Sequence, residues 1–379
     1  MSDALLARLF GDSEPGRFGT GWISGVASVF LGALALGGVL CLHFPEALTS
    51  PELRAIYPMH VVRGLVQGVL VTAFVAGLLS ALLRRRKVLG LTGMGLVVLA
   101  TLMGGAQVPA PGTVAHSPYL GLDWFLLNIL FTVLVFVPLE CAAPLRASQG
   151  PFRPGWTTDL AYFFASHALV QVLSLLILFP ASVALGAIGS EALAAIVSSW
   201  PWAAQFLLVV LVADVAQYAL HRAFHRVPLL WRFHRVHHSV EAMDWLAGSR
   251  LHLVDVVVTR GLVLVPIVLL GFDRSVLAAY LAFVALHAVF IHANFAPTAS
   301  WIETIVVMPR FHHWHHAAQA EAVDRNFAVH LPWIDGLFGT RFLPAAGWPE
   351  RYGLIGERAP ARFLAQFAWP FRRSKGPVR

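Results

Sequence analysis

Charged residues are scarce in this sequence of 379 residues. Asp, Glu, Lys and Arg make up 12% of the chain and hydrophobic residues 58%, whereas about 25% of the residues of a soluble globular protein are charged. Cysteine is nearly absent as well. Cys41 and Cys141 form no CxxC pair, which excludes iron–sulfur, zinc-ribbon and redox-dithiol sites. We expect both cysteines to be packing residues of apolar segments.

Long apolar segments occupy much of the chain instead. A helix needs about 20 residues to cross a bilayer, and six segments reach or approach that length: residues 22–42, 61–83, 88–108, 122–139, 160–185 and 202–220. A shorter pair, 253–270 and 276–294, lies on either side of GFDR. The sequence therefore predicts an all-α fold, a polytopic transmembrane helical bundle. The first segment is not expected to be a signal peptide, because it starts late, lacks a clear cleavage site and precedes further segments.

Basic residues mark the expected cytoplasmic side. The run RRRK at 84–87 separates the second and third segments, and short loops rich in Lys and Arg face the cytoplasm. This orientation places the stretch that opens with His221, and the C-terminal FRRSKGPVR, inside. The shorter apolar pair fits a hairpin, so histidines before and after it meet on one membrane face. Basic loops also account for the net charge of +7, and no nucleic-acid recognition motif is present, so no nucleic-acid partner is expected.

A turn-rich stretch, PAPGTVAHSPYLG at 109–121, predicts a domain boundary. It separates an N-terminal membrane region with three predicted spans, residues 1–121, from a region that carries most of the histidines, residues 122–345. Residues 346–379 are expected to form a basic cytoplasmic tail. The first three spans carry no motif, and their role stays open.

Histidine is the residue that carries a chemical pattern. Seventeen occur, and twelve fall between positions 221 and 316. His221 and His225 form HxxxH, and HxxHH occurs twice, at 234–238 and 312–316. Side chains three or four positions apart share a helix face, and neutral imidazole ligates zinc, copper, iron and nickel. The clusters predict a metal site, whereas scattered histidines are expected to be structural: His43, His60, His116 and His167.

The number of clustered histidines indicates two metal ions, because a zinc site takes three or four protein ligands. The zinc-protease motif HExxH is absent, since HRAFH at 221–225 has arginine where the glutamate would stand. Two redox-active ions beside a bilayer favour oxygen chemistry. Iron is the first choice for both ions, and zinc is expected to be able to substitute in a purified protein. Ligand softness leaves copper and manganese open.

The motifs around these histidines resemble those of the fatty acid hydroxylase and sterol desaturase superfamily. The segments that carry the resemblance are PLECAAPLR, RPGWTTDLAYFF, DVAQYALHRAFH, LLWRFHRVHHS, IHANF, PRFHHWHHA and NFAVHLPWIDGLFGT. They extend over roughly residues 122–342. Each segment is a weak signal alone, and the combination is specific.

The resemblance implies a membrane-bound non-haem di-iron enzyme that uses O2 and external electrons to hydroxylate or desaturate a lipid, such as an acyl chain, a sterol or a related isoprenoid. The ligands it implies are His221, His225, His234, His237, His238, His292, His312, His315 and His316. His287 and His252 are possible further ligands. His252 lies in SRLHLVD, where many relatives have R-x-HPLE, so the match there is incomplete. His313 is expected to be a bystander, and His330 an ordinary loop residue.

Two polar residues precede His221 on the same helix face. Asp214 lies seven positions and Tyr218 three positions before it. A carboxylate beside a ligating imidazole orients it through the other ring nitrogen, and an acid within an apolar span is costly without a function. We therefore expect Asp214 and Tyr218 to support the histidines. Weaker candidates for the same task are Asp244, Asp255, Asp324 and Asp335.

The electron donor is expected to be a separate protein, because the sequence lacks the motifs of electron-transfer domains. The sequence has no HPGG stretch, no GxGxxG and no cysteine cluster, so electrons are expected from a separate ferredoxin, cytochrome b5-like protein or reductase that docks on the basic inner face. The lipid is expected to enter from the bilayer.

Alternatives within the superfamily are an epoxidase and an ether-lipid or head-group hydroxylase. A histidine-lined metal transporter is disfavoured because the clusters lie at span ends, and a degenerate scaffold because the clusters are complete. The oligomeric state stays open.

Overall fold

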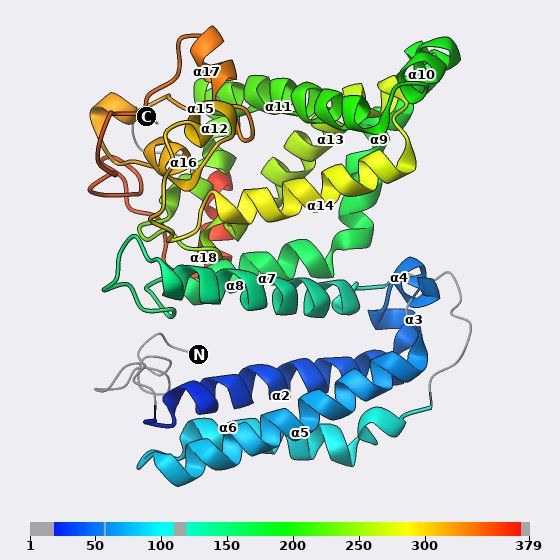
Figure 1. Ribbon diagram of the computed structural model, residues 1–379, viewed down its shortest axis with the longest axis vertical. Helices are drawn as coiled ribbons and strands as arrows, with labels where there is room; N and C mark the ends of the chain where they lie inside the picture. The colour runs from blue at the N-terminus through cyan, green and yellow to red at the C-terminus, as the bar shows by residue number, and fades with distance from the viewer. Residues whose placement is uncertain (1–18, 57, 110–118, 373–379) are drawn as a thin grey trace. The chain divides into compact units, whose positions relative to one another are not determined.

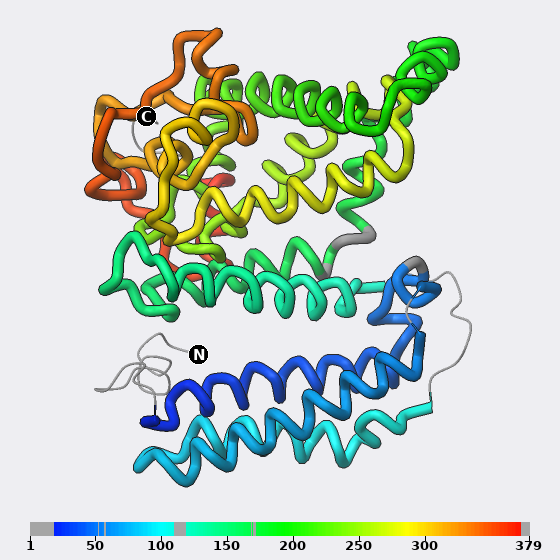
Figure 2. Tube along the Cα trace, viewed as in Figure 1, coloured from blue at the N-terminus to red at the C-terminus, as the bar shows by residue number. Residues whose placement is uncertain are grey.

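The computed structural model describes residues 19–56, 58–109 and 119–372 (Figure 1). Within these ranges the fold is helical, and the only β-type pairings are two isolated bridges, Pro144–Phe295 and Ala317–Tyr352. The chain divides into two compact units, residues 1–131 with 167–171, and residues 132–166 with 172–379. Figure 2 follows the same path as a tube. The all-α fold expected from the sequence is confirmed.

Three long helices form the core of the first unit. They are α2 (Trp22–His43), α5 (Met59–Leu83) and α6 (Val88–Leu102), each packed on the other two. Small residues let these backbones approach closely: a Cβ on Gly93 would lie 1.9 Å from Ser28 Oγ, and one on Gly90 would lie 2.4 Å from the Gly77 carbonyl oxygen. The shorter elements of this unit are α3 (Pro45–Leu48), α4 (Pro51–Ile56) and η1 (Gly105–Gln107).

Six helices among the described residues are long and apolar enough to cross a membrane. They are α2, α5, α6 continued through η1, α7 (Leu122–Ala142), α11 (Trp202–Arg226) and α13 (Leu253–Leu270). The apolar segment expected at 160–185 is two helices, α8 (Trp156–Ala168) and α9 (Val170–Ile188), bent by 60° at their junction; counting the pair as one span gives seven. The protein is therefore a multi-pass integral membrane protein.

The second unit is built on α11, which packs against α13 and α14 (Arg274–Phe290). Its apolar core includes Val209, Ala213, Ile267 and Val276. Helix α13 is capped by Gly271, whose φ of 66° is readily adopted only without a side chain, and α14 begins three residues later. The short α10 (Glu191–Ser198) precedes α11 and is capped by the Ser190 hydroxyl, which accepts from the Leu193 amide.

Short helices and loops gather near the C-terminal end of α11 (Figure 1). They are α12 (Pro228–His234), η2 (His237–Ser239), η3 (Ala247–Ser249), α15 (Ile302–Ile305), α16 (Pro309–His315), η4 (Ala320–Ala322) and α17 (Trp333–Leu337). These elements carry most of the clustered histidines that α11 does not; the exceptions are His252, His287, His292 and His316, which directly follows α16.

The C-terminal segment packs on the histidine-bearing loops through α18 (Phe363–Phe367) and η5 (Trp369–Phe371). The Arg235 guanidinium lies 4.0 Å from the centre of the Trp369 ring and donates to Glu357 at 2.8 Å. Trp369 also joins a core cluster with Tyr162 and Val236. Residues 373–379 of the expected tail lie outside the described part of the chain, and the expected boundaries at 121 and 345 stay predictions.

Candidate metal centre

Helix α11 presents its two histidines side by side near its C-terminal end. His221 and His225 are one turn apart, and their ring centres are 5.3 Å apart. The backbone carbonyl of Phe327 accepts a hydrogen bond from His221 Nδ1 at 2.7 Å. His225 Nδ1 lies 3.4 Å from a carboxylate oxygen of Asp324. The helix supplies the spacing, and the chain around residue 325 fixes the orientation of both rings.

The first HxxHH motif lies where α12 passes into η2. His234 ends α12, and its Nδ1 pairs with the Asp255 carboxylate at 2.7 Å. His237 Nδ1 donates to the Arg250 carbonyl at 3.2 Å. His238 follows in η2 and is buried. A change from α-helix to 3-10 turn within the motif thus directs its histidines toward different neighbours.

The second HxxHH motif lies on α16, with His316 directly after it. His315 Nδ1 donates to the Arg325 carbonyl at 2.7 Å. Arg325 lies between Asp324 and Asn326, whose φ values of 58° and 59° are uncommon for residues other than glycine, although Asn and Asp tolerate them best. This strained turn aims the Arg325 carbonyl at His315.

His292 follows α14 at the far end of the α13–α14 pair. Its Nδ1 donates to the Ala288 carbonyl at 2.7 Å, one turn earlier in the chain. Its Nε2 lies 3.3 Å from Nε2 of His237, which precedes α13. Histidines before and after the apolar pair therefore meet, as the hairpin interpretation expected.

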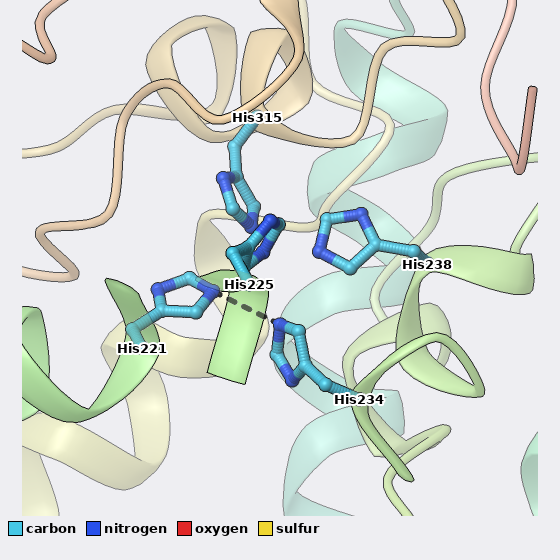
Figure 3. Close-up of side chains that lie close together, drawn as sticks. All are labelled: His221, His225, His234, His238 and His315. Carbon is cyan, nitrogen blue, oxygen red and sulfur yellow. Dashed lines mark hydrogen bonds between the residues drawn. The ribbon is translucent and has the colours of Figure 1, made fainter. Parts of the chain in front are cut away.

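The nine histidines assigned by resemblance fall into two groups, and in each group one nitrogen from every residue lies within 4.8 Å of the others. The five-histidine group, shown in Figure 3, consists of His221, His225, His234, His238 and His315. The four-histidine group consists of His237, His292, His312 and His316. The groups adjoin, since the rings of His238 and His316 stack with centres 4.5 Å apart.

The nitrogens that face one another have the chemistry of metal ligands. A carbonyl oxygen only accepts, so each Nδ1 bonded to one carries the proton and leaves a lone pair on Nε2. His237 and His292 both meet this condition, and their Nε2 atoms lie 3.3 Å apart with no hydrogen between them. A buried cation between such lone pairs removes their repulsion. A metal–nitrogen bond of about 2.1 Å fits the spacing of both groups.

Buried nitrogens without a partner strengthen the fit. In the five-histidine group, Nε2 of His225, His238 and His315 have no hydrogen-bond partner among the described residues. The large majority of buried polar atoms in folded proteins have a partner, which can be a protein group, an ordered water or an ion. The residues present thus suit a metal ion in each group.

Electrostatics keep the rings outside the spans neutral. Burial, followed by the neighbouring imidazoles, holds the pKa of His237, His238, His312, His315 and His316 well below the ordinary value. Burial also lowers the pKa of His292 to about 4. Neutral imidazole is the form that binds metals.

The structure places the two possible further ligands outside both groups. His252 caps the start of α13, where its Nδ1 accepts from the Val254 amide and its Nε2 bonds the Phe367 carbonyl. His287 pairs with His330 through their Nδ1 atoms at 2.9 Å and bonds the Val307 carbonyl. His313 bonds Tyr352 Oη at 2.8 Å. Histidines elsewhere take no part in either group as far as the structure describes them, and His116 lies outside the described residues.

Asp214 and Tyr218 have different contacts from those expected. The Asp214 carboxylate accepts from the backbone amides of Val329, His330 and Leu331 at 2.7–3.1 Å. Tyr218 Oη bonds Thr340 Oγ1 at 2.9 Å. Neither has a hydrogen bond to an imidazole within the described residues, because both point toward the 327–340 segment. They hold the loop whose Phe327 carbonyl orients His221.

The acids that do contact imidazoles are Asp255 and Asp324, which the sequence offered only as weaker candidates. Asp335 supports a histidine indirectly. It accepts from the amides of Phe327 and Ala328 at 2.8 and 2.7 Å, and the Phe327 carbonyl bonds His221. Spacing along one helix could not reveal these acids, because each comes from a different segment than the histidine it supports. Of these acids, Asp255 had the clearest signal in the sequence, because it lies three residues after His252, where many relatives have the glutamate of R-x-HPLE.

Comparison with known proteins shows which family the chain is similar to. The family model for fatty acid hydroxylase matches residues 206–340. The chain is 30% identical over 256 residues to the ornithine lipid hydroxylase OlsE of Rhizobium tropici, covering 66% of this chain and 76% of that protein. It is 31% identical over 143 residues to alkylglycerol monooxygenase of Homo sapiens, covering 38% of this chain and 31% of that protein. No solved structure matches.

Fold and site together define a polytopic membrane protein with a buried, histidine-rich site suited to metal ions. The chain belongs to the fatty acid hydroxylase family, which confirms the resemblance drawn from its motifs. As a member of that family it is an oxygen-dependent lipid hydroxylase.

Proposed function

We propose that this chain is a di-iron enzyme that inserts an oxygen atom from O2 into a C–H bond of a membrane lipid, with electrons from a separate protein. The observation that carries the proposal is the convergence of nine imidazoles into adjoining groups of five and four. The ligands we propose are His221, His225, His234, His238 and His315 for one ion, and His237, His292, His312 and His316 for the other.

Iron is the metal we assign to both groups. Imidazole suits several transition metals, and O2 chemistry on an unactivated C–H bond requires a redox-active one. Bound iron supplies the activation of O2 and the removal of the hydrogen atom. The zinc ion is redox-inactive, so zinc that replaces iron in purified protein leaves it inactive.

The protein's own residues hold and shield the site. Eight of the nine histidines are buried, with exposed fractions of 1–5%. Phe327 closes one side of the five-histidine group, with its ring centre 5.1 Å from that of His225. Such burial excludes bulk water from the reacting groups. The apolar spans around the site suit an alkyl chain that enters from the bilayer.

The lipid class has two candidates. A hydroxylase acting on an acyl chain or sterol is the broad expectation. An ether-lipid or head-group hydroxylase is favoured by the similarity to the ornithine lipid hydroxylase and to alkylglycerol monooxygenase. We propose the second class as the narrower assignment, since the first relative is similar over most of its own length.

We propose that the electron donor docks on a cytoplasmic face near the junction of α11 and α12. Trp231 is partly exposed there, and its ring centre lies 5.0 Å from that of His225 and 5.4 Å from that of His238. Arg226 and Arg232 flank it, and the Arg226 side chain is 58% exposed. Basic residues at a span end support a cytoplasmic orientation and attract an acidic donor.

Lipid analysis tests the proposed activity. Cells that express the chain and are grown with isotopically labelled O2 should accumulate a lipid that carries one labelled oxygen. His237→Ala and His315→Ala should abolish that product, whereas His60→Ala, a change at an exposed histidine, should keep it. A lipid that gains a double bond without oxygen, or a product that survives His237→Ala, would contradict the proposal.

A further inference from the structure

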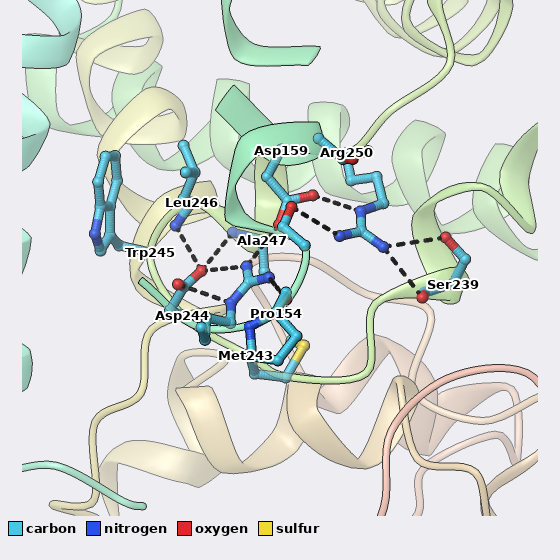
Figure 4. A network of polar contacts seen from close by, with 12 residues as sticks. Pro154, Asp159, Ser239, Met243, Asp244, Trp245, Leu246, Ala247 and Arg250 are labelled. Atoms are coloured by element: carbon cyan, nitrogen blue, oxygen red, sulfur yellow. Dashed lines mark hydrogen bonds and ion pairs between the residues drawn. The ribbon is translucent and has the colours of Figure 1, made fainter. Parts of the chain in front are cut away.

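Figure 4 shows a buried network of charged side chains. The network adjoins the four-histidine group, because the Arg250 carbonyl bonds His237, but it contributes no ligand to that group. It alternates in charge, in the order Asp244, Arg153, Asp159 and Arg250. The Arg153 guanidinium donates to both oxygens of Asp244, at 2.8 and 2.6 Å, and lies 2.7 Å from Asp159. Arg250 donates to the other Asp159 oxygen. The side chains are 0–7% exposed.

Such a network needs a reason beyond stability. Buried ion pairs are often no more stabilising than apolar residues of similar size, although breaking one is costly. Their best-supported use is to fix a unique arrangement.

Asp244 shapes the loop that follows it. Its Oδ1 accepts from the amides of Leu246 and Ala247 at 3.1 and 2.9 Å, which starts the η3 turn. Arg250 closes the same loop, and its guanidinium also donates to the Ser239 carbonyl at 3.2 Å, next to His238. The network thus fixes both ends of residues 244–250.

This loop touches two members of the four-histidine group. The carbonyl of Arg250 accepts from His237 Nδ1 at 3.2 Å. Gly248 packs flat against the His292 ring, where a Cβ would lie 2.8 Å from Nδ1 and 3.1 Å from Cγ. The Nε2 atoms of these two histidines face each other across 3.3 Å.

We propose that the Asp244–Arg153–Asp159–Arg250 network and Gly248 are positioning residues for one metal ion of the pair, the one held by the four-histidine group. The inference rests on the proposed function, since it requires that this group binds metal. The five-histidine group is oriented by other residues, among them Asp255, Phe327 and Arg325. Damage to the network therefore removes one ion and leaves the other.

Gly248→Ala is the sharpest test, because it adds one methyl group against His292 and changes no charge. Gly336→Ala is the matched control, since a Cβ there meets nothing within 4 Å. Metal content of the purified full chain should fall from two ions toward one in Gly248→Ala and stay at two in Gly336→Ala. The iron spectrum of Gly248→Ala should lose the component of one site and keep that of the other. A merely structural role would lower both components together.

Asp159→Asn tests the network itself, by removing the charge between the two arginines. Loss of orienting partners typically lowers metal affinity about 10–100-fold, and that loss should appear at the same site as in Gly248→Ala. Two ions with an unchanged spectrum in both variants would overturn the inference. So would equal loss at both sites in Gly248→Ala. A wild-type chain without metal would instead refute the proposed function, so the two failures are distinguishable.

Discussion

The Asp255 carboxylate accepts a hydrogen bond from His234 Nδ1 at 2.7 Å, although 21 positions separate the two residues in sequence. The other carboxylate oxygen is held by the Thr259 hydroxyl at 3.1 Å. This pairing leaves the His234 Nε2 lone pair facing Nε2 of His221, 3.1 Å away (Figure 3). A carboxylate in this position orients an imidazole and raises its strength as a ligand.

Asp255→Asn should weaken metal binding at the five-histidine group by about 10–100-fold, because the neutral amide holds His234 less firmly. Metal titration of the stripped protein measures the change. Glu321→Gln, at an exposed acid, is the control and should bind as wild type. Equal affinity in Asp255→Asn and wild type would show that this carboxylate does not support a ligand.

Asp214→Asn should lower stability rather than metal occupancy. The carboxylate accepts from three backbone amides, and an asparagine would turn its NH2 group toward at least one of them. An unsatisfied buried donor costs about 1–3 kcal/mol. Thermal unfolding in detergent should show the loss, while the folded fraction keeps the wild-type ratio of metal to protein. Reduced metal at an unchanged unfolding temperature would restore the orienting role expected from sequence.

Substitution of His312 and of its neighbour His313 should have different effects on metal content. His312 belongs to the four-histidine group, whereas His313 bonds Tyr352 and the His292 carbonyl. His312→Ala should release one ion, and His313→Gln, which keeps hydrogen-bonding capacity, should release none. The metal content of the two purified variants shows which of the two histidines is a ligand. Loss of an ion in His313→Gln alone would mean that the group has been assigned to the wrong imidazole.

Acid should destabilise the metal-free protein. The pKa of His292 is lowered to about 4 by burial, against about 6.5 in an unfolded chain. Between these values the unfolded state binds the proton and the folded state does not, so stability falls as pH drops below about 6.5. For His292 the loss is about 3 kcal/mol when complete, at 1.36 kcal/mol per pH unit. His237, His238, His312, His315 and His316 act in the same direction.

Thermal unfolding of metal-free protein at stepped pH measures this dependence. The unfolding temperature should be nearly constant above pH 7 and fall from pH 6.5 toward pH 4. Metal-loaded protein should resist until protons displace the ions, because a coordinated imidazole cannot be protonated. An unfolding temperature of the metal-free form that stays constant between pH 7 and pH 5 would contradict the neutral state of the buried imidazoles.

Sequence predicted the parts of this molecule that depend on local pattern. Apolar length gave the membrane helices, and i, i+3 and i+4 spacing gave the histidine motifs. The family resemblance then assigned the nine histidines that the structure brings together in two groups. Their partition was beyond the sequence, because His237 and His238 are neighbours in the chain yet fall into different groups. Both lie within the 3-10 turn of η2, in which there are three residues per turn, so neighbouring side chains point in different directions.

Long-range contacts were the other limit. Helical spacing places Asp214 on the histidine face of α11, but its carboxylate accepts hydrogen bonds from the backbone amides of residues 329–331 instead. The Asp244–Arg153–Asp159–Arg250 network joins segments about 90 residues apart. No periodicity within one segment encodes such a pairing. Tertiary packing determines which polar groups meet: it places Asp214 against backbone amides and Asp255 against His234.

Diffraction from crystals of the iron-loaded protein, collected at the iron absorption edge, tests the central claim most directly. We predict two anomalous peaks, one among the Nε2 atoms of the five-histidine group and one within the four-histidine group. A single peak, or iron located away from these nitrogens, would contradict the two-ion site on which the proposed lipid hydroxylation rests.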